Sequence, residues 1–148
     1  MKSRLADFEW EHLDKIKLRE FDEIGLAVVP NSKEQLQFYM DTGICYTGMV
    51  GDKVVMIGGV SVTWPGVGFV WLLTSDLVKE HKAFFHRTCL NIIEKGIVKY
   101  KLHRVDTAIM KDHEVSLKWA NRLGFQQEGI MKKYDSEGND YCLFARVI

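Results

Sequence analysis

The sequence lacks the features that identify a secreted, membrane-spanning or disordered protein. No apolar run approaches the roughly 20 residues that cross a bilayer, and the first residues carry no apolar stretch of the signal-peptide type. Only two prolines and no low-complexity tract occur. The three cysteines Cys45, Cys89 and Cys142 are odd in number and far apart, which fits neither a disulfide framework nor a zinc spacing. We therefore expect a cytoplasmic protein with buried free thiols, no membrane partner and no metal.

A surplus of either charge is also missing. The chain has 20 basic and 20 acidic residues, and nucleic-acid binding requires a basic surplus or patch. We therefore expect no nucleic-acid partner. What the sequence does have is 47% hydrophobic residues in 148 positions, enough for the core of a single domain.

The apolar pattern predicts alternating helices and strands. Helical periodicity covers residues 8–24, 32–41, 79–95 and a segment that ends at 123. Strands are predicted at 45–50, 53–64, 67–74, 103–110, 126–134 and 141–148. Alternation along 53–64 is typical of a half-buried strand, and Gly58-Gly59 within it indicates a bulge or a close backbone approach. The order predicts an α/β protein with a mixed sheet.

The most informative stretch runs from Ser116 to Gly129. A short amphipathic helix is predicted to stop at Gly124, because glycine after a helix end is the usual left-handed cap. Phe125 follows and is expected to pack back on the last turn. A strand and a hairpin at 136–139 complete the chain.

This element order resembles the GNAT superfamily of acyl-coenzyme A-dependent N-acetyltransferases, over residues 45–148 above all. The terminal motif is similar to the branch that acetylates ribosomal-protein N-termini. The matching residues are His113-Glu-Val-Ser116, Leu123-Gly-Phe125, Glu128-Gly129 and Lys132-Lys-Tyr134. The segments 12–23, 57–59 and 70–75 look like small phage-encoded GNAT-like proteins, including an internal virion protein family of short-tailed phages.

The resemblance implies a splayed central sheet and acetyl-coenzyme A as co-substrate. The acetyl group would pass directly to an amine acceptor, either a protein N-terminus or a small amine. In the superfamily the central strand separates from the next one and binds the pantetheine arm through its backbone. Here the backbone groups of Leu72, Leu73 and Thr74 would fill that role, and 105–110 would be the strand from which they separate.

The pyrophosphate would lie at the start of the following helix, where free N–H groups and the dipole favour an anion. The family's glycine-rich signature is absent from 78–83, and only Ala83 fits its last small position. Lys79, His81 and Lys82 are expected to compensate by side-chain charge, whereas Glu80 would repel a phosphate. The alternative is a solvated helix start with ordinary surface charges.

Two further residues are implied by the terminal motif. His113 stands where the branch has an Asn that binds the pantetheine arm, and Ser116 matches a serine that protonates the leaving thiolate. The alternatives are a loop histidine and a local helix cap.

The residues offer no distinctive general base. Asp76 at a strand end is a candidate by position, as are Glu20, Asp22 and Glu23; the alternative for each is a surface charge. Trp64 and Trp71 are candidates for the lining of an acceptor groove; the alternative is that they are core residues. Residues 131–134 are candidates for a wall of that groove.

The leading hypothesis is therefore an N-acetyltransferase. The rival is a catalytically inactive phage or prophage GNAT-like protein with a structural or binding role, in the host cytoplasm or the virion. The final strand is expected at a sheet edge, where pairing with a second copy would give a homodimer.

Overall fold

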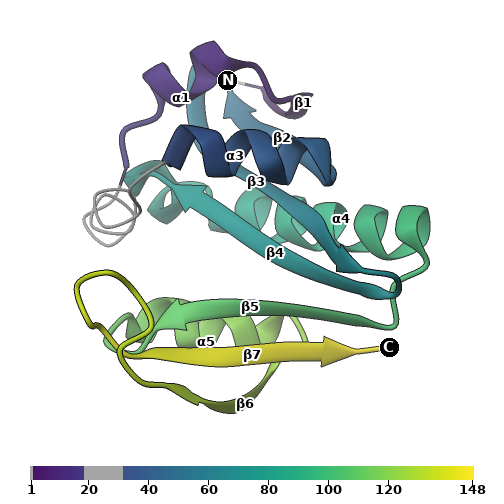
Figure 1. Cartoon of the computed structure of the whole chain (residues 1–148). Helices are drawn as coiled ribbons and strands as arrows, with labels where there is room; N and C mark the ends of the chain where they lie inside the picture. Colours follow the sequence, from purple (N-terminus) through teal and green to yellow (C-terminus); the bar gives the residue numbers. More distant parts are fainter. Residues whose placement is uncertain (1, 19–31) are drawn as a thin grey trace.

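Strands of mixed direction form the centre of the molecule (Figure 1). The computed structural model describes residues 2–18 and 32–148. The strands are β1 (Ser3–Asp7), β2 (Gly43–Val50), β3 (Lys53–Trp64), β4 (Val67–Thr74), β5 (Arg104–Met110), β6 (Gln126–Met131) and β7 (Tyr141–Val147). The helices are α1 (Trp10–Lys15), α3 (Ser32–Asp41), α4 (Lys82–Tyr100) and α5 (Glu114–Arg122), with a 3-10 turn η1 (Asp76–Lys79). No described helix has both the length and the apolar character needed to span a bilayer.

The described strands make a single sheet that is open and mixed. Its order is β1-β2-β3-β4-β5-β7-β6, and β4 and β5 are its parallel neighbours. They pair only from Val67 to Phe69 on β4 and from Arg104 to Asp106 on β5, and they separate beyond those residues. This confirms the mixed, splayed α/β sheet predicted from the sequence.

Each face of the sheet has its own core. The α4–α5 face is covered by α4 and α5, whose Phe85, Ile92 and Ala120 pack with Val70 and Phe144 of the sheet. The α3 face is covered by α1 and α3, and its core residues are Ile16, Leu36, Met49, Val54, Ile57, Trp71 and Leu73. Alternate residues of β4 therefore belong to different cores, as expected for a central strand.

Strand β3 is more deeply buried than its alternating pattern predicts. Every residue from Val54 to Ser61 is buried, because helices cover both faces of this part of the sheet. Gly58 and Gly59 mark close backbone approaches: a Cβ on Gly58 would lie 2.4 Å from Leu72 Cδ2, and one on Gly59 would lie 2.1 Å from the Ile44 carbonyl oxygen. The pairing irregularities of β3 lie elsewhere, opposite Gly48 and near Val62.

The end of α5 confirms the glycine cap predicted from the sequence. Gly124 has φ +91°, in the left-handed region that glycine adopts without strain. The N–H of Phe125 donates to the Ala120 carbonyl at 3.1 Å, and the N–H of Gly124 donates to that of Asn121 at 3.1 Å. This is the Schellman pattern, and it turns the chain from α5 into β6.

The structure differs from the sequence prediction at three places: one strand was missed, and two expectations were wrong. Residues 3–7 form an edge strand that the sequence pattern did not reveal. The first helix ends at Lys15, and Leu18 already forms a bridge with Ser75; residues 19–24 of the predicted helix lie outside the described residues. The final strand β7 lies between β5 and β6, so it is not an edge strand. A homodimer through the final strand's edge is therefore excluded.

The cysteines are free thiols, as expected. Cys89 and Cys142 are buried, whereas Cys45 is partly exposed. Burial raises the pKa of the Cys45 thiol to about 12, so this side chain stays a neutral thiol at physiological pH.

Candidate functional site

The site is organised by the point at which β4 and β5 separate. The hydroxyl of Thr107 on β5 donates to the Val70 carbonyl on β4 at 2.8 Å, just beyond the last paired residues. From there the two strands diverge toward their carboxyl ends, and the divergence opens on the left of Figure 1. Beyond Val70, the backbone of β4 is therefore no longer paired with β5.

Strand alternation decides which β4 residues direct their backbone into this divergence. The Val70 carbonyl points toward β5, while the Ser75 N–H points toward β3 and donates to the Val55 carbonyl. Successive residues of a strand point their backbone groups to opposite sides. The backbone groups of Leu72 and Thr74 are thus directed toward β5, and those of Leu73 toward β3. Of the three residues expected to hold a pantetheine arm, Leu73 is the one turned away.

The predicted phosphate-binding stretch forms two turns rather than one helix start. Lys79 ends η1, and His81 precedes the first residue of α4, Lys82. Lys79, Lys82 and Ala83 are exposed and His81 is half-buried. No side chain caps the start of α4, and its first turn carries no acidic residue.

The start of α4 is therefore suited to an anion. The helix itself offers no partner to the N–H groups of Lys82, Ala83 and Phe84. The dipole places a partial positive charge there, and Lys79 and Lys82 add side-chain charge nearby in the sequence. Both lysines come from the stretch where the sequence lacks glycine.

Asp76 lies on the surface in front of α4. Its carboxylate is 3.7 Å from Lys79 Nζ, and the two side chains are 78% and 73% exposed. Its neighbour Ser75 is buried and donates to the Val55 carbonyl at 2.9 Å. This exposed, ion-paired carboxylate lacks the burial that tunes a general base. Glu20, Asp22 and Glu23 lie outside the described residues.

His113 and Ser116 lie together at the start of α5. Ser116 Oγ is 3.3 Å from His113 Nε2, and both side chains are half-buried. His113 is the residue before the first turn of α5, but it makes no side-chain cap bond to the helix. The pair follows directly on the carboxyl end of β5, at the open end of the divergence.

Helices α4 and α5 meet through aromatic residues that the sequence analysis did not select. The rings of Phe85 and Trp119 stack with centroids 4.6 Å apart, and Trp119 Nε1 donates to His86 Nδ1 at 3.3 Å. Trp119 lies one helical step after Ser116, at i+3, so both fall on one face of α5. That spacing is the signal in the sequence that could have indicated a contact surface on α5.

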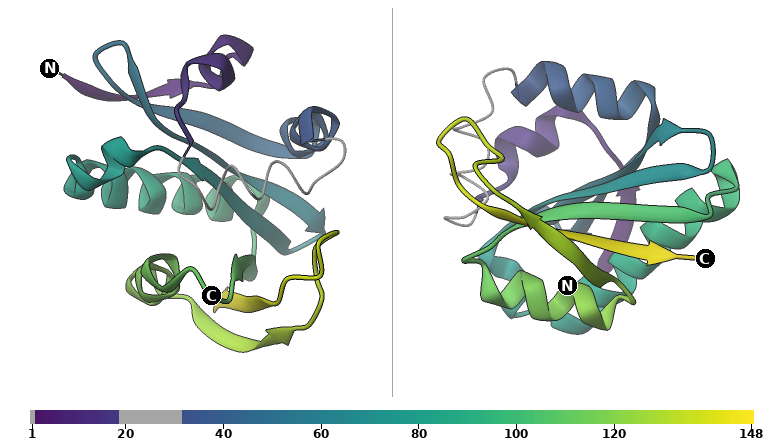
Figure 2. Two further views of the ribbon diagram at one scale, coloured as in Figure 1. Left: turned by 90° about the vertical axis from the view of Figure 1, so that its left-hand side faces the viewer. Right: turned by 60° about the horizontal axis from the view of Figure 1, so that its bottom comes forward.

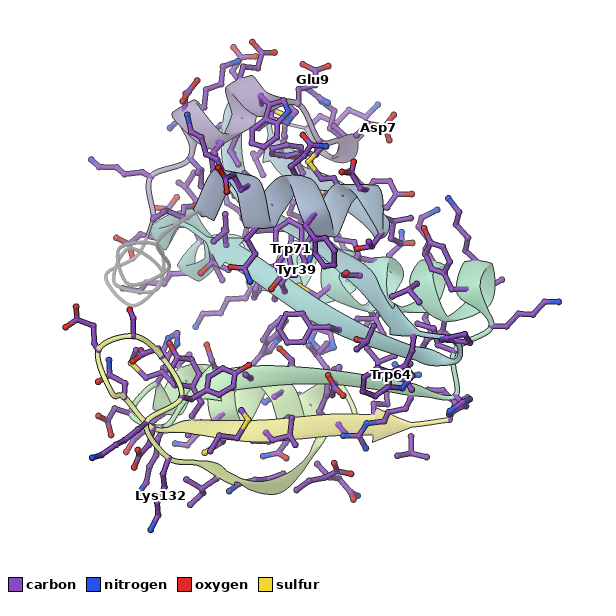
Figure 3. All side chains as sticks on the ribbon, in the orientation of Figure 1. Asp7, Glu9, Tyr39, Trp64, Trp71 and Lys132 are labelled. Atoms are coloured by element: carbon purple, nitrogen blue, oxygen red, sulfur yellow. The ribbon has the colours of Figure 1, made fainter. Side chains whose placement is uncertain are left out.

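A second aromatic group lies on the α3 face. Tyr39 of α3 stacks on Trp71 with centroids 5.6 Å apart and contacts Phe69 at 5.8 Å; Figure 3 shows Tyr39 and Trp71 together beneath α3. Trp71 is 8% exposed, and its Nε1 is the buried side-chain donor without a partner among the described residues. Trp64, the other predicted groove residue, is 63% exposed and lies at the opposite, paired end of β4 (Figure 3).

One group of side chains has the composition of a metal site. Ligand atoms of Glu9, Glu11 and His12 lie within 4.8 Å of one another. His12 Nδ1, however, accepts the Glu9 N–H at 3.1 Å and lies 2.8 Å from Thr47 Oγ1. The buried imidazole thus anchors α1 on β2; Glu9 of this group lies at the top of Figure 3.

Comparison with known proteins gives matches at the level of structure. No protein-family model matches the sequence, and no curated protein matches it. A Bacillus subtilis acetyltransferase in complex with CoA aligns over 99% of both chains with a TM-score of 0.73 and 19% identity. A GNAT family acetyltransferase from Elizabethkingia anophelis with acetyl-CoA bound aligns over 99% of this chain and 98% of its own, with a TM-score of 0.71 and 11% identity.

A ribosomal-protein alanine N-acetyltransferase from Escherichia coli is a third match. It aligns over 99% of this chain and 94% of its own, with a TM-score of 0.71 and 12% identity. All three span nearly the whole chain, including the diverging strands and both helices of the α4–α5 face. The chain therefore has the fold of the GNAT acetyltransferases.

Proposed function

We propose that the protein transfers an acetyl group from acetyl-coenzyme A to an amine. The observation that carries this proposal is the separation of β4 from β5 after Phe69 and Asp106. It leaves the backbone of Leu72 directed into a gap beside the start of α4. Structures of the same fold have CoA or acetyl-CoA bound, and a strand edge next to an open helix start matches a ligand with amide groups and phosphates.

The roles of this chain's residues follow from their positions. Leu72 and Thr74 offer backbone groups to the pantetheine amides, and the start of α4 with Lys79 and Lys82 holds the phosphates. In the reaction the amine nitrogen, having released a proton to water, forms a bond to the acetyl carbon as the carbon–sulfur bond breaks. Ser116 is the proton donor to the leaving thiolate and regains a proton, through water, from the nitrogen as the amide forms; His113 orients its hydroxyl across 3.3 Å.

Binding of acetyl-coenzyme A is the test. Calorimetric titration should give a saturable signal, and a thermal melt should shift upward, because a ligand that binds the native state stabilises it by about 2.7 kcal/mol at about 100 times its Kd. For a domain of this size that corresponds to roughly 5–10 °C. Absence of both heat and shift at millimolar ligand would rule the proposal out.

The lysines at the start of α4 should carry part of this affinity. Replacing Lys79 and Lys82 together with Ala should weaken acetyl-coenzyme A binding about tenfold at low salt, since partly exposed charges near phosphates act over about 10 Å at 0.1 M ionic strength. The matched control replaces Lys95 and Lys99, which are exposed and on the same helix, with Lys99 about 25 Å along the axis from Lys82. Equal affinities in both double variants would show that backbone N–H groups alone hold the phosphates.

A non-catalytic structural role is the second candidate. The observation that favours it is the glycine-free start of α4, where Ala83 is the single small residue that matches the family signature. The same titration separates the two functions, because a purely structural protein has no reason to retain affinity for acetyl-coenzyme A.

A further inference from the structure

The side chains proposed to act on the cofactor belong to one face of the sheet. α4 and α5 cover the α4–α5 face; the proposed phosphate site lies at the start of α4 and Ser116 at the start of α5, while Leu72 and Thr74 contribute backbone groups from β4. With acetyl-coenzyme A bound on this side, the second reactant needs another route to the divergence. The amine must therefore approach from the α3 face.

Aromatic rings border the divergence on the β4 side of the α3 face. Phe69 and Trp71 alternate with Val70 and so point to the α3 face, where Tyr39 lies over both, with centroid distances of 5.8 and 5.6 Å. Phe69 and Tyr39 are only partly buried. Each ring thus keeps exposed surface next to the place where β4 leaves β5.

Tyrosines border the other side. Tyr134 in the β6–β7 loop and Tyr141 of β7 have ring centroids 5.2 Å apart. Burial and then the charge of Asp135 raise the pKa of Tyr141 to about 12, so its neutral hydroxyl donates to Asp135 Oδ2 at 3.3 Å. Burial, and next the charge of Tyr134, raise the pKa of Tyr39 as well.

The sheet between these two aromatic groups has no described helix over it. Figures 1 and 2 show α1 and α3 over β1 to β4, whereas the described helix beside β5, β7 and β6 is α5, on the opposite face. By alternation with the core residues Val105 and Phe144, the side chains of Ala108, Met110 and Leu143 point to the α3 face. All three are half-buried. These three side chains form an apolar surface between the two groups of aromatic residues.

We propose that this surface, made by Tyr39, Phe69, Ala108, Tyr134 and Tyr141, binds a small primary amine that carries an aromatic ring. The role of this amine as acetyl acceptor rests on the proposed function. Binding of the amine to the surface does not depend on that function. Aromatic side chains attract a flat ring by offset or edge-to-face stacking and an ammonium group by its charge. An arylalkylamine offers both, and its nitrogen reaches the divergence while its ring stays among the tyrosines.

The proton balance of the proposed acetyl transfer determines which form of the amine the surface has to bind. The ammonium form binds and loses one proton to water, and the neutral amine attacks the acetyl carbon. The nitrogen–carbon bond forms and the carbon–sulfur bond breaks; the second proton, which the nitrogen loses as the amide forms, ends on the thiolate. The acceptor is therefore a primary amine with an uncharged ring: the five side chains of the surface carry no charge, and the Asp135 carboxylate beside Tyr141 would repel a negative group on the ring.

The experiment uses 2-phenylethylamine and its saturated analogue 2-cyclohexylethylamine. Ligand-observed NMR titration of the full chain, without acetyl-coenzyme A, should show the aromatic amine binding about tenfold more tightly than the saturated one. A peptide with an N-terminal Ala tests the alternative acceptor class. Equal affinity of the two amines, or tighter binding of the peptide, would overturn the proposal.

Variants locate the site without disturbing the core. Tyr134 is 54% exposed, so Tyr134→Leu should fold normally and weaken 2-phenylethylamine binding about tenfold, while Tyr134→Phe keeps the ring and most of the affinity. Trp64→Leu removes a similarly exposed aromatic at the paired end of β4 and should change nothing. Loss of affinity in Trp64→Leu, or retention in Tyr134→Leu, would place the amine elsewhere and overturn the assignment.

Turnover separates this inference from the proposed function. With acetyl-coenzyme A present, release of free thiol should depend on 2-phenylethylamine, and its KM should follow the order of affinities among the variants. Aromatic-amine binding without thiol release would uphold the site and contradict the acetyl transfer. Thiol release with a peptide but not with 2-phenylethylamine would do the reverse.

Discussion

Replacing Gly59 with Ala is expected to lower the free energy of unfolding by about 3 kcal/mol, as overpacking of a well-packed core does. The new Cβ would lie 2.1 Å from the Ile44 carbonyl oxygen and 3.1 Å from Trp71 Cζ2. The first of these atoms is backbone in the neighbouring strand β2, so it cannot rotate away as a side chain end can. Relief requires β2 and β3 to move apart.

Such a movement is costly because β3 lies in the middle of the sheet. β2 and β4 pair with it on either side, and Val55, Met56, Ile57 and Val60 are fully buried. Interiors of this density transmit a displacement instead of absorbing it. The affected neighbours include Trp71, so a shift of β3 reaches the aromatic residues of the α3 face as well.

Urea denaturation monitored by circular dichroism measures the effect, and a thermal melt should fall by roughly 6–12 °C. The control is Gly129→Ala in β6, where a Cβ meets no atom within 4 Å and the change should stay within about 0.5 kcal/mol. A loss below 1 kcal/mol in Gly59→Ala would mean that β2 and β3 separate more easily than their burial indicates.

Local patterns predicted the strands after β1 and the α5 cap, because their determinants lie within a few residues. The range 53–64 is bounded by turn residues at both ends and coincides with β3. Gly124 and Phe125 encode a cap whose bonds all fall within six residues. Where geometry is set by neighbours in sequence, composition and spacing were sufficient.

Sheet order and burial depended on contacts that no local pattern records. The alternating pattern of β3 predicted that one face of the strand is buried. Helices from distant segments of the chain cover both faces. The last strand entered between β5 and β6, because the β6–β7 hairpin pairs with β5 through β7. Position at the end of the chain therefore said nothing about position in the sheet.

The terminal motif shows the same limit at the level of one residue. Glu128 was part of the pattern that suggested an acyltransferase, but its carboxylate accepts two hydrogen bonds from Arg104, at 2.6 and 3.0 Å. That hydrogen bonding lowers the pKa of Glu128. The residue joins β6 to β5 across β7, beside an irregular pairing between Gln127 and Gly129. Glu128 belongs to the motif because its ion pair with Arg104 stabilises the sheet. Its presence is therefore no evidence for catalysis.

The candidate site residues were selected by their position in the sequence. The structure separates them by the direction in which their backbone groups or side chains point. Leu72 and Leu73 are equivalent in the sequence, but strand alternation sends the backbone of one toward the divergence and of the other toward β3. Asp76 follows the strand end as expected and is a surface carboxylate. Tyr39 was outside any motif, whereas Tyr134 was part of the terminal motif and of the predicted groove wall; its ring contact with Tyr141 was not predicted.

Replacing Ser116 with Ala is expected to lower kcat about 100-fold, because a positioned general acid contributes a factor of about 10² or more. Affinity for acetyl-coenzyme A and the melting temperature should change little, since the half-buried hydroxyl makes one long hydrogen bond of 3.3 Å, to His113. Steady-state thiol release at saturating amine and acetyl-coenzyme A measures the effect.

Two further variants separate proton donation from packing. Ser116→Cys keeps a group that donates a proton and should recover part of kcat, whereas Ser3→Ala makes the same deletion on the exposed edge strand β1 and should leave kcat as it is. If Ser116→Ala and Ser3→Ala were equally active, the thiolate would take its proton from water. The hydroxyl at the start of α5 would then be a structural neighbour of His113, and the chemistry would depend on the divergence of β4 and β5 alone.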